Sequence, residues 1–600
     1  MDTTQVIMQG VMLAGGLALF LYGMDVMSSG LEKIAGGKLE SILKMMTSNK
    51  LVAFILGLVV TCVIQSSSAV TVMLVGLVNS GIMQLGQTIG VIMGSNVGTT
   101  ITAWILSLSG LEGDGLLVSM LKPKNFSMIV ALIGIILIMF TKSGKKKDIG
   151  TVCVGFAVLM QGMEFMSSAV SDLKNEPWFS DLFVAFDNPV FGVIIGTVLT
   201  GIIQSSSASV GILQAISLTG CLTYGMSLPI IMGQNIGTCM TALLSCIGAK
   251  SDAKRVAVAH VIIKIIGVLV FLPVVVLLES LGLMGFMENT VDPVGIAIMH
   301  TVFNLLNTFV LLPFSKQIVK LACFFVKNKD GEGTGEAVSG IIVLDENLLK
   351  TPSVAVEVCR NSAIEMAELT RTTIKDALFL LKEGYDKELD QKVVDNETAL
   401  DNYEDKLNGY LVKISKESIT GADSRKVSKM MHIVGNLERI SDHAVNLAES
   451  AKEMAEKGIS FSPDGKHEVA VITEAIAENI DKALDAYIHD DLALAHKIEP
   501  LEEVVDNISK ALKSRHIHRL QNDECTVELG YIFQDVLTNL ERISDHCSNI
   551  AGCMIEVDEK ENIHEYLHDI KANDKKFQEE YRRFSGIYFT KLGITDTELS

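Results

Sequence analysis

The sequence predicts an all-α protein made of a polytopic membrane region, with two inverted repeats and re-entrant hairpins, followed by a soluble pair of three-helix bundles. Three observations predict this fold. Apolar runs long enough to enter a lipid bilayer fill residues 1 to about 330 and then stop. Two motifs in that region recur at one fixed spacing. Beyond it, the chain is charged and has the periodicity of amphipathic helices.

Charge separates the two parts as clearly as hydropathy does. Residues 1–330 contain 19 Lys and Arg against 17 Asp and Glu, a net charge of +2, while the whole chain has a net charge of -20. Residues 331–600 therefore have a net charge of -22. An acidic soluble part is poorly suited to nucleic acid, so we expect no nucleic-acid partner and regard cations as its more plausible ligands.

The membrane region contains an internal duplication. Gln-Ser-Ser-Ser-Ala spans residues 65–69 and 204–208, and Gly-x-Asn-x-Gly-Thr spans residues 94–99 and 233–238. Both motifs are offset by 139 residues, which indicates two copies of one unit.

Loop charges predict the orientation of the two copies. The basic segment 142–147 corresponds to the uncharged segment 281–286, and the basic segment 250–255 corresponds to residues 111–116, whose only charges are acidic. Because short cytoplasmic loops are enriched in Lys and Arg, we expect the copies to be inverted, as in many secondary transporters.

Segment lengths predict the topology within each copy. Residues 51–64 and 66–79 are each too short to span a hydrocarbon core of about 30 Å, so we expect them to form a re-entrant hairpin with Gln65–Ser68 at its turn. The predicted boundaries are repeat 1 at 1–141, repeat 2 at 149–280, a final transmembrane span at 281–329, a linker at 330–350, a cytoplasmic helical domain at 351–560 and a charged helical tail at 561–600.

Polar motifs inside apolar runs predict a binding site in the membrane. Hydroxyls and freed backbone carbonyls suit a desolvated Na⁺, while Ser hydroxyls and helix N-terminal amides suit an oxyanion. The alternative is that Ser, Gly and Asn only allow helices to pack closely. The candidate substrate and sodium ligands are Gln65, Ser66, Ser67, Ser68, Asn96, Thr99, Thr100, Gln204, Ser205, Ser206, Ser207, Asn235 and Thr238.

The charge of a bound oxyanion must be offset, because neither motif contains Lys or Arg. Helix dipoles and co-bound cations are the available means, which favours coupling to Na⁺. Asp25 and Glu164 are offset by 139 residues and are either ion ligands or interfacial acids. For the polar residues of the last two spans we favour hydrogen bonds between helices over transport roles: His260, Lys264, His300, Asn304 and Asn307.

The soluble part repeats the string Asn-Leu-Glu-Arg-Ile-Ser-Asp-His at 436–443 and 539–546. Its Glu and Asp are four residues apart and share a helix face, where like charges repel. A divalent or ferric ion would relieve that repulsion, whereas a capping and salt-bridge pattern with Arg439 and Arg542 is the alternative. The predicted metal ligands are Glu438, Asp442, Glu541 and Asp545, with Glu404, Glu502 and Asp506 as candidates to complete the sites.

These residues carry a family resemblance. The paired QSSSA and GxNxGT motifs resemble the type II sodium/phosphate cotransporter family over about residues 10–315, and the tandem ERISDH helices resemble the PhoU family over about residues 350–556. The resemblance implies a non-enzymatic, Na⁺-coupled carrier for uptake of inorganic phosphate. It also implies that Ser66–Ser68 and Ser205–Ser207 lie near substrate and sodium, and that the Glu-x-x-x-Asp faces hold metal clusters.

The expected setting follows from this resemblance and from the loop charges. We expect a multi-pass protein of the inner membrane with its helical domain in the cytoplasm, where it regulates uptake and contacts a signalling partner; a homodimer is a further candidate assembly. Two other functions stay open: a membrane-anchored phosphate receptor with little flux, and a phosphate exporter.

Overall fold

The described residues of this computed structural model are helical. Their only β-type pairing is one isolated bridge between Thr223 and Thr290, which confirms the predicted all-α fold class. The acidic segment 111–116, residues 330–343 of the predicted linker and residues 561–574 of the predicted tail lie outside the described residues. The described ranges are 3–44, 49–108, 123–141, 143–173, 188–327, 344–417, 419–522, 524–559 and 575–594.

The chain forms two compact units. The first comprises Met1–Glu336 together with Asp345–Val354, and the second comprises Ala337–Leu344 together with Ala355–Ser600. The short segment Asp345–Val354 therefore belongs to the first unit, although it follows the predicted linker.

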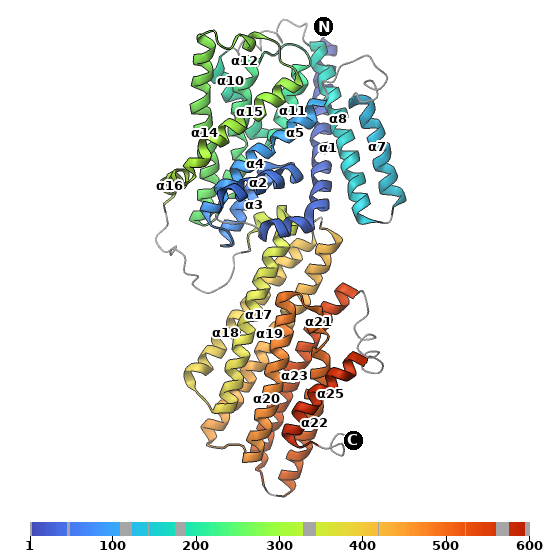
Figure 1. The fold of residues 1–600 in the computed structure, drawn as a ribbon, viewed down its shortest axis with the longest axis vertical. Coiled ribbons are helices and arrows are strands. Elements are labelled where there is room, and N and C mark those ends of the chain that lie inside the picture. Colours follow the sequence, from blue (N-terminus) through green and yellow to red (C-terminus); the bar gives the residue numbers. More distant parts are fainter. Residues whose placement is uncertain are drawn as a thin grey trace. The chain divides into compact units, whose positions relative to one another are not determined.

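The first unit (Figure 1) contains fourteen α-helices among its described residues. They are α1 (Thr3–Lys44), α2 (Lys50–Ile64), α3 (Ser67–Asn79), α4 (Leu85–Gly98), α5 (Thr100–Ser107), α7 (Pro123–Phe140), α8 (Gly144–Leu173), α10 (Pro189–Ile203), α11 (Ser206–Ser217), α12 (Tyr224–Gly237), α13 (Cys239–Ser245), α14 (Ser251–Ser280), α15 (Pro293–Leu311) and α16 (Ser315–Phe325).

Helix boundaries in this unit repeat at the spacing of the motifs. Helices α2 and α10 have 15 residues each, α4 and α12 have 14 each, and both pairs start 139 residues apart. Five helical stretches are long and apolar enough to cross a bilayer: Thr4–Ile34, Leu85–Ser107, Gly144–Ser171, Ser251–Ser280 and Pro293–Phe325. Helices α2, α3 and α10 are apolar but shorter, as the arms of the expected hairpins would be.

Helices α1 and α8, the first of each copy, lie side by side (Figure 1) and approach through glycines. A Cβ atom at Gly16 would lie 2.8 Å from the nitrogen of Met166, and one at Gly23 would lie 2.3 Å from the nitrogen of Leu159. The partner positions fall along α8 as they rise along α1, so the two helices are antiparallel. This is the relation that an inverted repeat requires of its first helices. The opposite orientation of the complete copies stays a prediction.

A short 3-10 helix, η5 (Glu346–Lys350), packs against the ends of both copies. Leu348 is fully buried against Gly76 of α3, where a Cβ atom would lie 2.6 Å from the Leu348 Cδ2. Asn79 at the end of α3 donates to Asp345 at 2.7 Å, and Asn347 donates to the carbonyl of Ser245 at the end of α13 at 3.0 Å. Residues immediately before the second unit are thus part of the core of the first.

The second unit is built from six long helices, one short helix and a C-terminal helix. The six long helices occupy the segments that the amphipathic pattern predicts. Their bounds are α17 (Pro352–Glu383), α18 (Lys387–Ser415), α19 (Gly421–Lys457), α20 (Pro463–His489), α22 (Ile498–Gln521) and α23 (Val527–Glu559), with α21 (Leu492–Ala495) between α20 and α22 and α25 (Lys575–Leu592) last.

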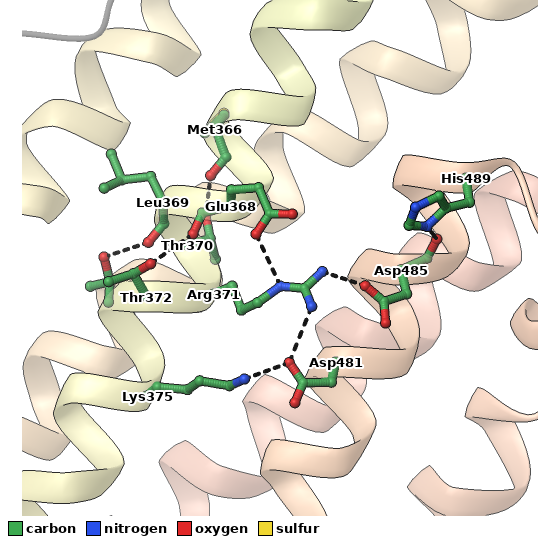
Figure 2. A network of polar contacts seen from close by, with 11 residues as sticks. Met366, Glu368, Leu369, Thr370, Arg371, Thr372, Lys375, Asp481, Asp485 and His489 are labelled. Atoms are coloured by element: carbon green, nitrogen blue, oxygen red, sulfur yellow. Dashed lines mark hydrogen bonds and ion pairs between the residues drawn. The ribbon is translucent and has the colours of Figure 1, made fainter.

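Arg371 joins α17 to α20, the first helices of the two predicted bundles (Figure 2). Its guanidinium lies 2.7 Å from Asp485 and 3.4 Å from Asp481 on α20, and 3.3 Å from Glu368 on its own helix. Lys375 adds a second bond to Asp481 at 2.8 Å. With an exposure of 18 %, the Arg371 side chain is shielded enough for this network to fix the spacing of the two helices.

Candidate functional site

Each Gln-Ser-Ser-Ser-Ala motif forms a break between two helices. Gln65 ends α2 with a left-handed φ of 59°, and Ser66 caps α3 by accepting the backbone N–H of Ala69 at 3.1 Å. Gln204 ends α10 with a φ of 58°, and Ser205 caps α11 through Ala208 at 3.2 Å. A positive φ is uncommon for a residue other than glycine, and both copies adopt it at the same position.

The break exposes two new helix N-termini within the membrane unit. The first amides of α3 and α11 have no acceptor within their own helices, and the macrodipole makes these ends attractive to an anion. Ser67, Ser206 and Ser207 are buried at these ends, and Ser66, Ser68 and Ser205 are partly buried. An oxyanion held there would receive backbone N–H and Ser O–H donors together.

The two glutamines differ in their surroundings. Gln65 is 6 % exposed; its Oε1 accepts from Thr102 of α5 at 2.8 Å, and its amide donates to the Cys62 carbonyl. Gln204 is exposed. Thr241, the equivalent of Thr102, instead donates to the carbonyl of Thr238 at 3.0 Å.

The Gly-x-Asn-x-Gly-Thr segments close α4 and α12. Asn96 and Asn235 are each 4 % exposed, Thr99 donates to the carbonyl of Ser95 at 3.0 Å, and Thr238 donates to that of Gln234 at 2.9 Å. In the first copy, Thr100 also donates to the carbonyl of Val97 at 2.8 Å.

The glycines of these segments serve helix packing. A Cβ atom at Gly94 would lie 1.9 Å from the carbonyl oxygen of Phe54, and one at Gly233 would lie 2.1 Å from that of Val193. Close packing, the alternative weighed for the whole motif, thus accounts for its glycines. It does not account for the polar side chains.

The second copy has three buried oxygens without a hydrogen-bond partner among the described residues: Thr200 Oγ1, Ser209 Oγ and Gln234 Oε1. Gln234 Nε2 donates to the carbonyl of Ser209 at 3.0 Å, and Thr200 lies against Gly237, so all three oxygens belong to the surroundings of one motif. A buried acceptor without a partner is costly, and a cation would satisfy it.

The first copy satisfies the equivalent positions internally. Thr61 and Ser95, offset by 139 residues from Thr200 and Gln234, bond to each other with a distance of 2.7 Å between their hydroxyl oxygens. The two copies therefore differ in the atoms that they leave available for a ligand.

Lys264 of α14 brings a positive charge to the second motif. Its Nζ donates to Asn235 Oδ1 at 2.6 Å, and the side chain is 3 % exposed. Within the described ranges, no carboxylate pairs with it. The bond joins two helices, as expected for Lys264, but the sequence did not reveal that it ends on a motif residue.

Other polar residues of the last two spans line the same region of the fold. His260 is one turn from Lys264 on α14, and Asn304 of α15 donates to the carbonyl of His300 at 2.9 Å. A Cβ atom at Gly267 would lie 2.6 Å from Asn307 Oδ1, so Asn307 packs directly on α14. These contacts agree with the expected hydrogen bonding and packing between helices.

A hydrogen bond joins the two copies near the first break. Gln214 of α11 donates to the carbonyl of Ala103 in α5 at 2.9 Å and to that of Pro293 at 2.9 Å. Ala103 directly follows Thr102, the partner of Gln65. The hairpin of the second copy is therefore fastened to the helix that holds the glutamine of the first.

The soluble unit contains two acidic clusters that could hold metal. One combines Asp442 with Glu397 and Asp401, and the other combines Asp545 with Glu502 and Asp506; in each, three carboxylate oxygens lie within 4.8 Å of one another. Oxygen ligands at such distances suit a hard divalent or ferric ion.

Glu438 and Glu541 stand outside these two clusters. Burial, followed by the charge of Asp442 and a hydrogen bond to it, raises the pKa of Glu438 to about 7, so a proton relieves the predicted repulsion. Burial also disfavours ionisation of Glu541, but its bonds to Lys513 at 2.7 Å and Ser509 at 3.0 Å outweigh that effect and lower its pKa. Arg542 contacts Asp545 at 3.3 Å, as the salt-bridge alternative expects.

The sequence analysis named four residues of the two clusters and missed two, Glu397 and Asp401. The pattern Glu-x-x-x-Asp-Asn occurs at 397–402 and again at 502–507, so a comparison of the two halves at this spacing would have found them. Glu404, the candidate that was named instead, accepts from Asn408 at 3.0 Å.

Comparison with known proteins agrees with this division. The Na+/Pi-cotransporter family model matches residues 19–168 and again 158–301, and the PhoU domain model matches residues 363–451 and 470–554. The chain is 24 % identical over 571 residues to YjbB of Escherichia coli, which is provisionally named an inorganic phosphate export protein; the match covers 92 % of this chain and 99 % of YjbB.

Two further relatives match the membrane unit or part of the chain. Uncharacterized protein YqeW of Bacillus subtilis is 30 % identical over 318 residues, which cover 52 % of this chain and 97 % of YqeW. Sodium-dependent phosphate transport protein 2A of Rattus norvegicus is 37 % identical over 100 residues, 16 % of each chain. The chain therefore belongs to the Na+/Pi-cotransporter family of membrane transport proteins and carries PhoU domains after its membrane unit.

Proposed function

We propose that this protein is a secondary transporter that couples the uptake of inorganic phosphate to Na⁺ by alternating access. The observation that carries the proposal is the pair of helix breaks at Gln65 and Gln204, which have the same backbone geometry and are followed by serine-capped N-termini. Paired half-helices of this kind bind anionic substrates in the middle of other transporters.

Sodium coupling is supported by the oxygens around the second motif. Thr200, Ser209 and Gln234 offer two hydroxyls and an amide carbonyl that lack a partner among the described residues. We assign the second copy as the location of a sodium ion. The first copy, with its Thr61–Ser95 bond, would contribute mainly to phosphate binding.

Charge also favours coupling to cations. A divalent phosphate that enters a negative cell opposes about 4.6 kcal/mol per 100 mV, twice the value of about 2.3 kcal/mol for one charge. Lys264 beside Asn235 would offset part of the anion's charge within the site. Sodium ions that move with phosphate would supply the rest of the driving force.

Export is the second candidate for direction. YjbB, which matches nearly the full length of this chain, is provisionally named for phosphate export. A symporter runs in the direction set by the combined ion and phosphate gradients, so one mechanism allows either direction.

For the second unit we propose a cytoplasmic regulatory role. The basic loops of the membrane unit would face the cytoplasm and place the chain after residue 330 on the same side. The clusters around Asp442 and Asp545 would hold divalent or ferric ions there.

Reconstitution tests transport and coupling together. Full-length protein in proteoliposomes should take up labelled phosphate when an inward Na⁺ gradient is imposed, and much less with K⁺ or choline in its place. Equal uptake in all three salts would remove the sodium coupling.

Counter-flow separates a transporter from a receptor. Vesicles preloaded with unlabelled phosphate should accumulate labelled phosphate transiently if the protein transports. Tight phosphate binding without counter-flow would instead favour a receptor with little flux.

A further inference from the structure

A basic cavity of about 320 Å³ lies within the acidic second unit, between the start of α17, the start of α19 and the end of α20. Arg360, Arg425, Lys426 and Lys429 line it. Its volume is near the lower end for small-molecule sites and larger than a single inorganic anion needs. Four cations around one cavity are unexpected in a part of the chain whose net charge is -22.

Asp490 organises two of these cations. It ends α20 with a φ of 53°, and its carboxylate oxygens lie 3.2 Å from Arg360 and 3.2 Å from Lys429. The side chains of Arg360 and Lys429 are only 17 % and 12 % exposed, so they are not freely solvated surface charges. The cavity walls are thus partly fixed before any ligand binds.

Acidic groups do not balance the cations of the cavity. Asp490 lines it, and Glu357 stands behind Arg360 at 3.7 Å, so four positive charges face two negative ones and leave a net charge of +2. A monocarboxylate would neutralise half of that excess, whereas a dianionic phosphate group would neutralise it. Arg side chains also match the geometry of phosphate oxygens.

Tyr487 provides an independent sign of a ligand. This residue lines the cavity, is 3 % exposed, and its hydroxyl has no hydrogen-bond partner among the described residues. A buried hydroxyl without a partner is costly and would be satisfied by a ligand oxygen. The Arg371 network holds α17 against α20 along the same seam (Figure 2), so the hydroxyl and Arg360 keep their spacing.

We propose that this cavity binds an anion that carries a phosphate group, and that it is distinct from the site in the membrane unit. The ligand would contact Arg360, Arg425 and Lys429 through its phosphate and accept a bond from Tyr487. The binding itself does not depend on the proposed transport. Arg360 lies on α17, which begins two residues after η5 ends, so the ligand site is linked by one continuous helix to the segment docked on the membrane unit.

Hydrogen exchange of the full-length chain in zwitterionic nanodiscs tests the proposal locally. Inorganic phosphate or ADP, each against chloride at equal ionic strength, should slow amide exchange several-fold in peptides from residues 421–430 and 484–491. A third arm replaces the soluble probes with nanodiscs that contain phosphatidylglycerol. Protection in that arm alone would identify a lipid headgroup as the source of the phosphate group, and protection by the soluble probes would identify a soluble phosphate ligand.

Three variants complete the test. Arg425→Gln, at an exposed position, should abolish the protection, and Tyr487→Phe, which removes only a hydroxyl, should weaken the apparent affinity several-fold. Lys452→Gln, on α19 but outside the cavity, should behave as wild type. Absence of protection in all three arms, or protection that persists in both Arg425→Gln and Tyr487→Phe, would overturn the proposal, whatever the outcome for transport.

Discussion

The imidazole of His443 stacks on that of His546, with ring centroids 5.6 Å apart and an angle of 26° between the planes. Each histidine closes one copy of the repeated eight-residue string, so the two copies pack against each other. His443 Nδ1 donates to Asn539 at 2.8 Å, and His546 Nδ1 donates to Asn436 at 2.9 Å. The strings are thus complementary to themselves, which gives a reason for their identity besides metal binding.

The stacked pair predicts an acid-sensitive interface. Burial, and then the charges of His443, Arg439 and Arg542, lower the pKa of His546 to about 4. The unfolded chain therefore binds a proton between pH 6.5 and 4 that the folded chain excludes, and the stability contributed by neutral His546 is lost as the pH falls through that range. His546→Gln should reduce the drop in melting temperature of the full-length protein between pH 7 and pH 5.

His432→Gln, an exposed histidine on α19, is the matched control and should leave that drop unchanged. If His546→Gln melts with the same pH dependence as wild type, His546 does not sense acid in the native protein.

The unequal copies predict unequal effects of one substitution. Thr200→Val removes a hydroxyl without a partner, so thermal stability should stay the same while the Na⁺ concentration for half-maximal uptake rises at least 10-fold. Thr61→Val breaks the bond to Ser95 and should cost about 1–3 kcal/mol of stability with little change in sodium dependence. A reversed pattern would place the sodium ion in the first copy.

Lys264 predicts a link between a fixed charge and phosphate affinity. Lys264→Gln retains a donor for Asn235 but removes the charge, so we expect the phosphate concentration for half-maximal uptake to rise about 10-fold, equivalent to about 1.4 kcal/mol. Lys264→Arg should keep most of the affinity, and Lys254→Gln, near the start of the same helix, should match wild type. Unchanged kinetics in Lys264→Gln would restrict this lysine to helix packing.

The serine-capped breaks predict loss of transport without loss of folding. Ser67→Ala and Ser206→Ala should each lower the rate of phosphate uptake at least 10-fold, because both serines lie in the first turn beyond a break. Ser280→Ala, at the exposed end of α14, serves as the control. Uptake at wild-type rates in both buried variants, measured in proteoliposomes with equal protein content, would make these serines packing residues.

The acidic clusters predict metal in the purified protein. Asp442→Asn and Asp545→Asn should each lower the manganese or iron content measured by mass spectrometry, since each removes the helix α19 or α23 ligand of one cluster. Asp535→Asn, exposed on α23, should leave the content unchanged. Equal metal content in all variants would favour the salt-bridge alternative.

The uniform offset predicted much of the membrane unit, because helix boundaries follow local apolar patterns that both copies share. It could not predict the environments of Gln65 and Gln204, since their neighbouring residues are nearly identical. The difference arises from what packs nearby: α15 covers α5 through the bond from Trp104 to Thr301 at 3.0 Å. Lys264 was missed as a motif contact because it follows Asn235 by 29 residues and lies on another helix.

The docked η5 helix determines where the two units of this chain can be separated. A membrane fragment that stops at residue 330 would leave Gly76 without Leu348 and Asn79 without the carboxylate of Asp345, a loss of about 1.5–3 kcal/mol for the leucine alone. A fragment that continues through Thr351 retains both contacts. Chimeras that exchange the soluble part between relatives should therefore be joined inside the first turn of α17, beyond the apparent domain boundary in the sequence.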